Sequence, residues 1–396
     1  MYEIVLKYAC PVSDIIAEDF LFMRIQLSEH FTYRKLLRFT LPSVIMMVCT
    51  SIYGVVDGVF VSNFVGSDAF AAVNLIMPFL MVLGAVGFML GTGGSALVAY
   101  TLGAGSEKRA NEIFSLLIYV LIGLGAVFTI GGIAFLTPMS RLLGADETML
   151  PVCVSYGRIV LLGLIPYMLQ NTFQSFLVTA ERPQLGLYVT IAAGVTNIVL
   201  DALFVAVLQW GVEGAALATI LSQAVSAAWV VAFLCSRRSS LRLHRVFLIP
   251  NKRIIGRIAG LGVAPFIMQS TESLVTVVLN TGMQTYGGDL YVGSITIMQS
   301  IMQMIVMPVQ GITQGTQPIM SYNYGAQNFR RVRQTFKRLL TITLSVTCAA
   351  FLFIALFPGL LARIFTPQPE LIGLVSRVMP LFFGGIWAFG AQMACQ

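Results

Sequence analysis

The sequence is poor in charge. Only 10% of its 396 residues are Asp, Glu, Lys or Arg, against roughly 25% in an ordinary soluble domain. So few charges could not cover the surface of a soluble fold, which excludes a soluble enzyme, a disordered protein and a fibrous repeat. The two histidines, His30 and His244, stand alone, and no pair of the six cysteines has metal-site or redox spacing. A P-loop is also absent, so ATP is not expected as the energy source.

Long apolar runs fill most of the chain. Apolar residues make up 57% of it, and the mean hydropathy is +0.85. Each run can cross the hydrocarbon layer of a bilayer, which takes about 20 helical residues. The pattern therefore predicts an all-α, polytopic membrane protein, since helices satisfy their backbone polar groups internally. The ten predicted spans are 36–62, 69–99, 113–136, 151–179, 185–208, 212–235, 257–282, 290–316, 334–358 and 370–394.

Basic residues predict the orientation. Clusters such as Arg34, Lys35 and Arg38 precede the odd-numbered spans, whereas the loops of the other face carry only Arg141 and Arg363. Because basic loops stay on the cytoplasmic side, we expect a multi-pass plasma-membrane protein with a cytoplasmic N-terminus. The net charge of +7 (24 − 17) is attributed to these loops rather than to a nucleic-acid-binding surface.

The chain repeats itself on the two sides of a basic segment, 236–256. Tyr100 and Gly103 match Tyr322 and Gly325 at one offset of 222 residues (322 − 100 and 325 − 103). A duplicated helical bundle is typical of secondary transporters, whose substrate path lies between the halves. The second bundle has four spans where the repeat calls for six, so we expect a C-terminal truncation. The predicted parts are a weakly structured cytoplasmic leader (1–33), an N-terminal six-helix bundle (34–235), the basic linker (236–256) and an incomplete C-terminal bundle (257–396).

Three acids fall well inside predicted spans, namely Asp57, Asp201 and Glu272. A carboxylate inside a bilayer costs a few kcal/mol, so each calls for an explanation. Asn197 lies one helical turn before Asp201 and shares its helix face with Thr190. Two carboxylates and a carboxamide suit a hard monovalent cation, or equally a proton shared between carboxylates. The alternative is that these acids only hydrogen-bond neighbouring helices and serve packing.

Polar stripes run along the seventh and eighth spans. Helical spacing places the members of each stripe on one face. Such a face is not expected to point at lipid, so it either lines a wet substrate cavity or hydrogen-bonds neighbouring helices. The cavity candidates are Gln269, Glu272, Thr276 and Asn280 in the seventh span and Gln299, Gln303 and Gln310 in the eighth, whose stripe continues through Gln314 and Gln317.

These features together resemble the multidrug and toxic compound extrusion (MATE) family, from about residue 35 to the end of the chain. The order of the motifs and the repeat of the bundle make the resemblance specific. The motifs are Pro42, Val-Val-Asp57-Gly, Glu-Arg182-Pro183, Asn197-Ile-Val-Leu-Asp201, Gly214-Ala-Ala-Leu-Ala-Thr219, Gln314-Gly-Thr-Gln-Pro318 and Tyr322-Asn-Tyr-Gly325-Ala326.

The resemblance implies a two-lobe antiporter that exports cationic or neutral amphipathic drugs in exchange for Na⁺ or H⁺. It implies partners that are small-molecule drugs and membrane lipid, with no cofactor, and we expect a monomer. Some relatives carry a cation site in the C-terminal lobe, formed by a glutamate in the seventh span and an acid in the tenth. Glu272 resembles that glutamate, but the only acid of the tenth span is Glu370 at its start. The implied site therefore lies in the N-terminal lobe, where the matching residues are Asp57, Asn197, Asp201 and Thr219. No other metal site is implied.

Two other functions share some of these features. A flippase for a lipid-linked precursor has similar architecture, but a pyrophosphate-bearing lipid calls for several arginines in the cavity. In-span arginine is limited to Arg158 and Arg377, near span ends. A membrane-embedded enzyme would need paired His ligands or a Ser/His arrangement, and the spans contain no histidine. The sequence therefore favours transport over catalysis.

Overall fold

The computed structural model describes residues 26–234, 252–366 and 368–395. Within these ranges the chain is helical and contains no strand, which confirms the all-α prediction. Two π-helical segments and one 3₁₀ segment extend the α-helices. The elements are α3 (Tyr33–Phe60), η1 (Val61–Val65), α4 (Ser67–Gly103), α5 (Glu107–Leu142), α6 (Met149–Leu162), α7 (Leu164–Thr179), α8 (Pro183–Asp201), η2 (Ala202–Val207), α9 (Gly211–Leu234), α10 (Lys252–Gly325), α11 (Phe329–Leu356), α12 (Pro358–Phe365), α13 (Pro369–Phe382), η3 (Phe383–Gly385) and α14 (Ile386–Cys395).

The helices have the length and apolarity of membrane spans. In the described ranges nine helices meet this test, and a tenth arises if α6 and α7, bent by 55° at Gly163, form one span. Each predicted span overlaps one of them. Helix α10 supplies two spans because Gly288, with φ 66° and ψ −163°, lies between a first arm (252–287) and a second arm (289–325). Only glycine adopts this backbone conformation readily.

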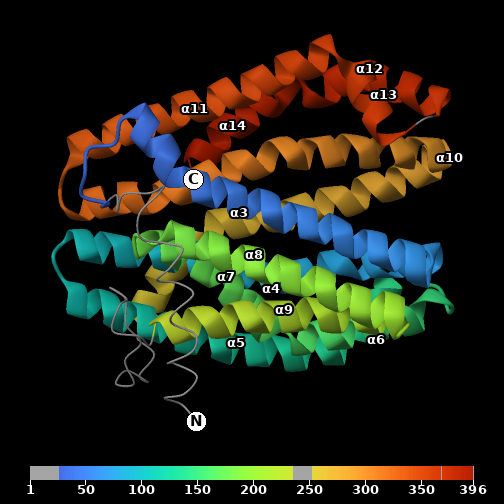
Figure 1. Cartoon of the computed structure of the whole chain (residues 1–396), viewed down its shortest axis with the longest axis horizontal. Coiled ribbons are helices and arrows are strands. Elements are labelled where there is room, and N and C mark those ends of the chain that lie inside the picture. Colours follow the sequence, from blue (N-terminus) through green and yellow to red (C-terminus); the bar gives the residue numbers. More distant parts are fainter. Residues whose placement is uncertain (1–25, 235–251, 367, 396) are drawn as a thin grey trace.

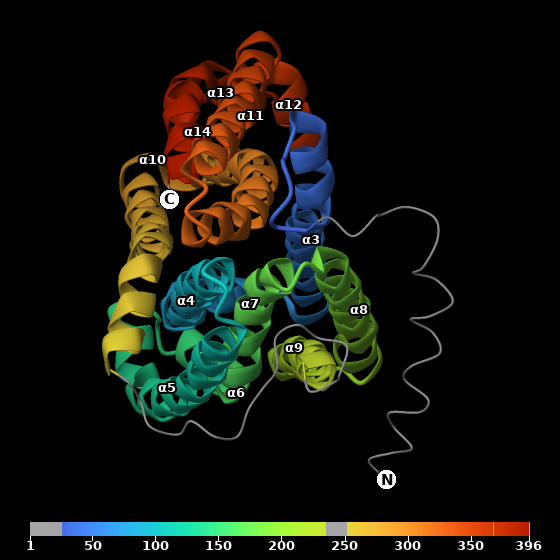
Figure 2. The same cartoon turned by 90° about the vertical axis from the view of Figure 1, so that its left-hand side faces the viewer.

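The helices form two bundles, which Figure 2 shows along their axes. Helices α4 to α9 lie in one bundle, and the second arm of α10 with α11 to α14 lies in the other. Helix α3 at one edge and the first arm of α10 at the opposite edge lie beside both bundles (Figure 2). We call α3 to α9 the N-half and α10 to α14 the C-half.

One end of the molecule carries the α4–α5 and α10–α11 turns (Figure 1). Lys108 and Arg109 begin α5 there, and Arg330 and Arg331 begin α11, so we call it the basic end. Because α3 begins at this end and runs to the opposite end, the acids in the later parts of α3 and α8 lie away from it.

The two copies of the sequence repeat touch each other at the basic end. A Cβ atom on Gly103 would lie 2.0 Å from the Tyr322 carbonyl oxygen, and one on Gly325 would lie 2.0 Å from the Tyr100 carbonyl oxygen. The tyrosine-to-glycine motifs thus meet reciprocally across the line between the halves. Backbone can come this close only where no side chain intervenes, so glycine is required at both positions.

Residues 26–32 pack against the rest of the protein at the same end. Leu27 and Phe31 are 1% and 2% exposed. Glu29 accepts a hydrogen bond from the Gln26 backbone and pairs with Lys35 at the start of α3, and both contacts lower the pKa of Glu29. The predicted weakly structured leader, 1–33, therefore includes a packed stretch. Its first 25 residues and most of the predicted linker, 236–256, lie outside the described residues.

Candidate functional site

Two of the three in-span acids lie at matching places in the N-half. Asp57 lies four residues before η1, and Asp201 is the last residue of α8, directly before η2. The two π-helical segments contact each other and α9. π-Helical turns are rare and occur preferentially at functional sites. The local backbone is therefore unusual at both acids, in the same region of the fold.

The acids converge across α3 and α8. Asp57 and Asp201 lie close enough for their charges to interact, and Tyr156 on α6 lies within electrostatic range of both. Asn197 and Asp201 are 1% and 0% exposed, and Asp57 is half-buried. The sequence placed Asn197 one turn before Asp201, and the structure points this face inward.

The polar atoms of this group have no hydrogen-bond partner among the described residues. They are Oδ1 of Asp57, both oxygens of Asp201, both Oδ1 and Nδ2 of Asn197, and Oε1 of nearby Gln170. A buried polar atom left without a partner costs about 1–3 kcal/mol. Packing alone does not account for such a group, because these six atoms are buried and yet have no hydrogen-bond partner among the described residues.

Thr190 and Thr219 lie on two different helices and differ in how deeply they are buried. Thr190 is 2% exposed on the inward face of α8, two turns before Asn197. Thr219 is half-buried on α9, which packs against α8. The described contacts of Thr219 are those of its backbone, whose carbonyl oxygen accepts a hydrogen bond from Ser222 Oγ at 2.8 Å.

The structure adds three residues that the sequence analysis did not select, Tyr53, Tyr156 and Gln170. The Tyr53 hydroxyl interacts with Gln170 and lies within electrostatic range of Asp57. Gln170 carried a usable signal, since an amide in an apolar span is as conspicuous as Asn197. The tyrosines carried none, because nothing in the sequence separates them from the other eleven of the 13.

The donor set suits a small hard cation or a proton. Five of the six unpartnered atoms are oxygens, and oxygen ligands are what hard cations prefer. Among the described residues, no group of three or more His, Cys, Asp and Glu could hold a metal ion. Two carboxylates with an amide one helical turn from one of them are instead matched to a single positive charge, which would neutralise half of the pair.

The third acid, Glu272, lies on the first arm of α10, whose earlier residues pack on α4. Ile258 and Gly262 on the first arm of α10 pack against α4, where a Cβ on Gly262 would lie 1.9 Å from the Met89 carbonyl oxygen. Steps of three and four residues carry this face onward through Pro265, Gln269, Glu272 and Thr276. Ile258 is buried, Gln269 and Thr276 are half-buried and Glu272 is exposed, so the face is more open beyond Pro265 than near the basic end.

A cavity of about 220 Å³ lies between α4 and the C-half, where this face is still covered. Gln310, Gln314 and Gln317 of the second arm line it, opposite Thr92 of α4. Gln314 also crosses to the N-half, since its Nε2 donates to Ser175 Oγ at 3.1 Å. The last three glutamines of the predicted stripe therefore share one cavity.

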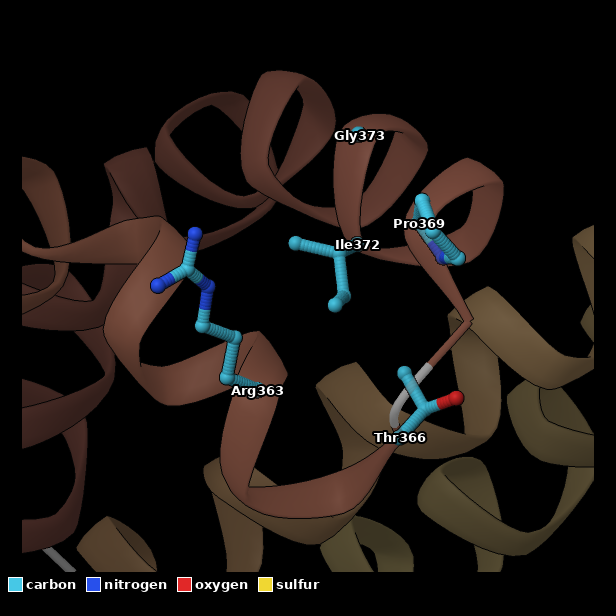
Figure 3. A pocket seen from close by; sticks show the side chains of 5 residues that line it. All are labelled: Arg363, Thr366, Pro369, Ile372 and Gly373. Atoms are coloured by element: carbon cyan, nitrogen blue, oxygen red, sulfur yellow. The ribbon is translucent and has the colours of Figure 1, made fainter.

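The other predicted cavity residues lie outside this lining. Gln299 is half-buried and Gln303 is exposed, farther along the second arm. The side chain of Asn280 lies outside the described residues. A larger hollow of about 600 Å³ opens at the α12–α13 corner, where Arg363 and Ile372 point into it (Figure 3). The residues that line it all belong to the C-half and include one charged side chain, that of Arg363.

A family model and curated proteins match most of the chain. The model described as MatE matches residues 42–203 and 265–396. The multidrug export protein MepA of Staphylococcus haemolyticus (strain JCSC1435) is 23% identical over 352 residues, which are 89% of this chain and 77% of that protein. MepA of Staphylococcus aureus (strain MSSA476) is 21% identical over 347 residues, which are 88% and 76%.

Solved structures share the fold. The outward-facing conformation of a multidrug resistance MATE family transporter of the MOP superfamily has a TM-score of 0.84 at 24% identity, with 95% of this chain and 85% of that chain covered. A MOP superfamily transporter from Pyrococcus furiosus has a TM-score of 0.81 at 24% identity, with 93% and 84% covered. At this identity the likeness shows the fold alone.

Proposed function

Because the chain belongs to the MatE family, we propose that it is a secondary active multidrug efflux antiporter of the plasma membrane. It exports cationic or neutral amphipathic drugs in exchange for Na⁺ or H⁺. The observation that carries the proposal is the group of Asp57, Asn197 and Asp201, in which Asp57 Oδ1 and every side-chain polar atom of Asn197 and Asp201 have no hydrogen-bond partner among the described residues. The relatives named multidrug export protein support the substrate class.

The coupling step follows from the chemistry of that group. Two carboxylates near each other in a poorly solvated site repel, so a bound Na⁺ or proton stabilises the site strongly. Asp57, Asn197, Asp201 and Thr219 would hold the cation and release it when the helices around them rearrange. Since α3 contacts both α8 and the C-half, a change at Asp57 has a direct route to the contact between the halves.

The drug path lies between the halves. The face of α10 that carries Gln269, Glu272 and Thr276 continues the face that packs on α4, and Gln310 lines the cavity beside it. Gln299, Gln303 and Asn280 extend this path in the proposal. Glutamine and hydroxyl groups bond drugs of varied shape, and Glu272 adds a preference for positive charge.

The orientation follows the charge distribution. Lysines and arginines gather at the basic end, so we assign this end to the cytoplasm and the opening face of α10 to the outside. The unit of transport is a monomer, because the path runs between the two halves of one chain. Membrane lipid surrounds it, and neither nucleic acid nor a cofactor takes part.

Vesicle transport tests the proposal. The purified chain is reconstituted, a fluorescent organic cation is loaded, and a Na⁺ or an H⁺ gradient is imposed separately. We expect efflux with one gradient and none without either. Efflux that needs no gradient, or none with both, would contradict antiport. Gradient-independent transfer of a lipid-linked pyrophosphate between leaflets would instead favour the flippase alternative.

A further inference from the structure

The segment 26–32 is bonded to both halves through a single residue. The Leu27 backbone N–H donates to Glu181 Oε1 at 2.8 Å, and Glu181 lies in the turn between α7 and α8 of the N-half. The Leu27 carbonyl oxygen accepts from Asn323 Nδ2 at 3.0 Å, and Asn323 lies on α10 of the C-half. Leu27 therefore links the halves through its own peptide groups.

Further bonds attach the segment to α11 of the C-half. Arg331 and Arg338 donate to the carbonyl oxygens of Ser28 and Phe31. His30 Nε2 lies 3.2 Å from Gln334 Oε1 on the same helix. Hydrogen bonds from charged donors are stronger than neutral ones. The segment is thus held along α11 and reaches back to the N-half at Glu181.

Its two apolar side chains enter a core that both halves share. Burying an apolar side chain of this size stabilises a fold by about 1.5–3 kcal/mol. Parting the halves at this point would expose that surface again. The members of this core are Leu27, Phe31, Leu36, Phe39 and Val178 from the first part of the chain, and Ile312, Ile319, Leu339, Ile342 and Ala394 from the C-half.

We propose that residues 26–32 form a clasp that holds the two halves together at the basic end and must release before they can part there. The clasp lies at the same end as the reciprocal contact of Gly103 and Gly325. A transporter that alternates has to separate these halves, so clasp strength sets how often it opens at this end. The inference rests on the proposed function for that alternation, but its test does not depend on drug or ion.

A substitution at Glu181 can remove one hydrogen bond of the clasp without disturbing the turn. It has a positive φ of 60°, a conformation that glycine adopts without strain. Glu181→Gly therefore removes the acceptor of the Leu27 bond without straining the turn. Glu181→Gln is the matched control, because it keeps the Oε1 acceptor. Asn323→Ala cuts the clasp from the C-half side.

The experiment measures the distance between the halves directly. Spin labels are placed on cysteines at Ser106 and Asn328, exposed residues of the two basic-end turns, in a background without the natural cysteines. Pulsed electron paramagnetic resonance then gives the distance distribution. We expect a short distance in the parent, and a ratio of long to short distances about fivefold higher in Glu181→Gly and in Asn323→Ala, as for one lost hydrogen bond.

A second control separates the clasp from general stability. Thr129→Val removes a hydrogen bond that stays within the N-half, from Thr129 Oγ1 to the Leu161 carbonyl oxygen at 2.9 Å. Thr129→Val should lower the melting temperature and leave the distance between the labels unchanged. Glu181→Gln should also leave that distance unchanged. Unchanged distances in both clasp variants, or an equal change in Thr129→Val, would overturn the clasp. Loss of drug efflux in the parent chain would instead bear only on the proposed function.

Discussion

The two halves share a repeat but treat their in-span acids differently. In the N-half, Asp201 is fully buried and Asp57 is half-buried, and both lie beside π-helical turns. Asp57 Oδ1 and both Asp201 oxygens have no hydrogen-bond partner in the part of the chain that the structure describes. In the C-half, Glu272 is exposed on α10, beyond the stretch of that helix that packs on α4. A buried unpartnered pair is built to bind and release one charge, whereas an exposed acid on an opening face attracts whatever enters. Duplication has thus left one half with coupling chemistry and the other with recognition chemistry in our proposal.

The largest expected effect is at Asp57. Asp57→Asn keeps the shape and removes the charge, so we expect gradient-driven efflux to fall to the level of empty vesicles while expression and folding persist. Vesicle efflux and the detergent elution profile measure the two properties. Glu147→Gln, at an exposed loop acid, is the control and should transport normally. Normal efflux from Asp57→Asn would remove the coupling role from the N-half.

The repeat contact predicts the next largest effect, with equal size in both halves. A methyl group at Gly103 or Gly325 meets a backbone carbonyl oxygen at 2.0 Å. Gly103→Ala and Gly325→Ala should each lower stability by about 1–3 kcal/mol, the usual cost of overpacking. Thermal unfolding in detergent measures this.

Glycines with open surroundings supply the control for that pair. A Cβ at Gly131 or Gly260, one in each half, meets nothing within 4 Å. Alanine there should be neutral or stabilise the helix by up to about 1 kcal/mol. A large difference between Gly103→Ala and Gly325→Ala would show that the contact is not reciprocal.

Sodium should stabilise the N-half site by an amount that depends on its concentration. If Na⁺ is the coupling ion, a hundredfold excess over its dissociation constant adds about 2.7 kcal/mol. Asp201→Asn should abolish this response and raise the melting temperature without sodium, because a buried carboxylate without partners is lost. If wild type and variant respond equally to Na⁺ over K⁺, the ion binds elsewhere. If the melting temperature of the wild type does not respond to Na⁺, H⁺ is the remaining candidate for the coupling ion.

The smallest effect is expected at Glu272. Glu272→Gln removes a charge from an exposed position, where attraction to a cation is worth about 1 kcal/mol. We expect the KM for a cationic drug to rise about fivefold and that for a neutral drug to stay unchanged. Equal losses for both drugs would assign Glu272 a structural role, and would remove the contrast between the halves.

Helices and in-span acids could be predicted from the sequence because both depend on local rules. Apolar runs longer than 20 residues form spans, and Asn197 and Asp201 share a face through helical spacing alone. The approach of Asp57 on α3 to Asp201 on α8 could not be predicted in this way, because it depends on how two helices 144 residues apart (201 − 57) pack.

The clasp was missed for the same reason. Residues 26–32 mix polar and apolar types, and no pattern within this segment predicts that any of them is buried. Leu27 is held in its buried position by Glu181, which accepts a hydrogen bond from its N–H, and by Asn323, which donates one to its carbonyl oxygen. Both partners are more than 150 residues away. Tyr156 likewise gains its place beside the acids only from the packing of α6. Tertiary contacts decide such positions, and local propensity is silent about them.

The reciprocal glycine contact also limits how the protein can change by mutation. What Gly103 meets is the carbonyl oxygen of Tyr322, which every amino acid at position 322 would present unchanged. A second mutation at Tyr322 or Tyr100 therefore cannot rescue an alanine at the opposite glycine. Suppressors recovered in a genetic selection should instead map to residues that let α4 and α10 shift apart as whole helices. The two glycines are thus constrained together by backbone atoms, whichever side chains stand at positions 100 and 322.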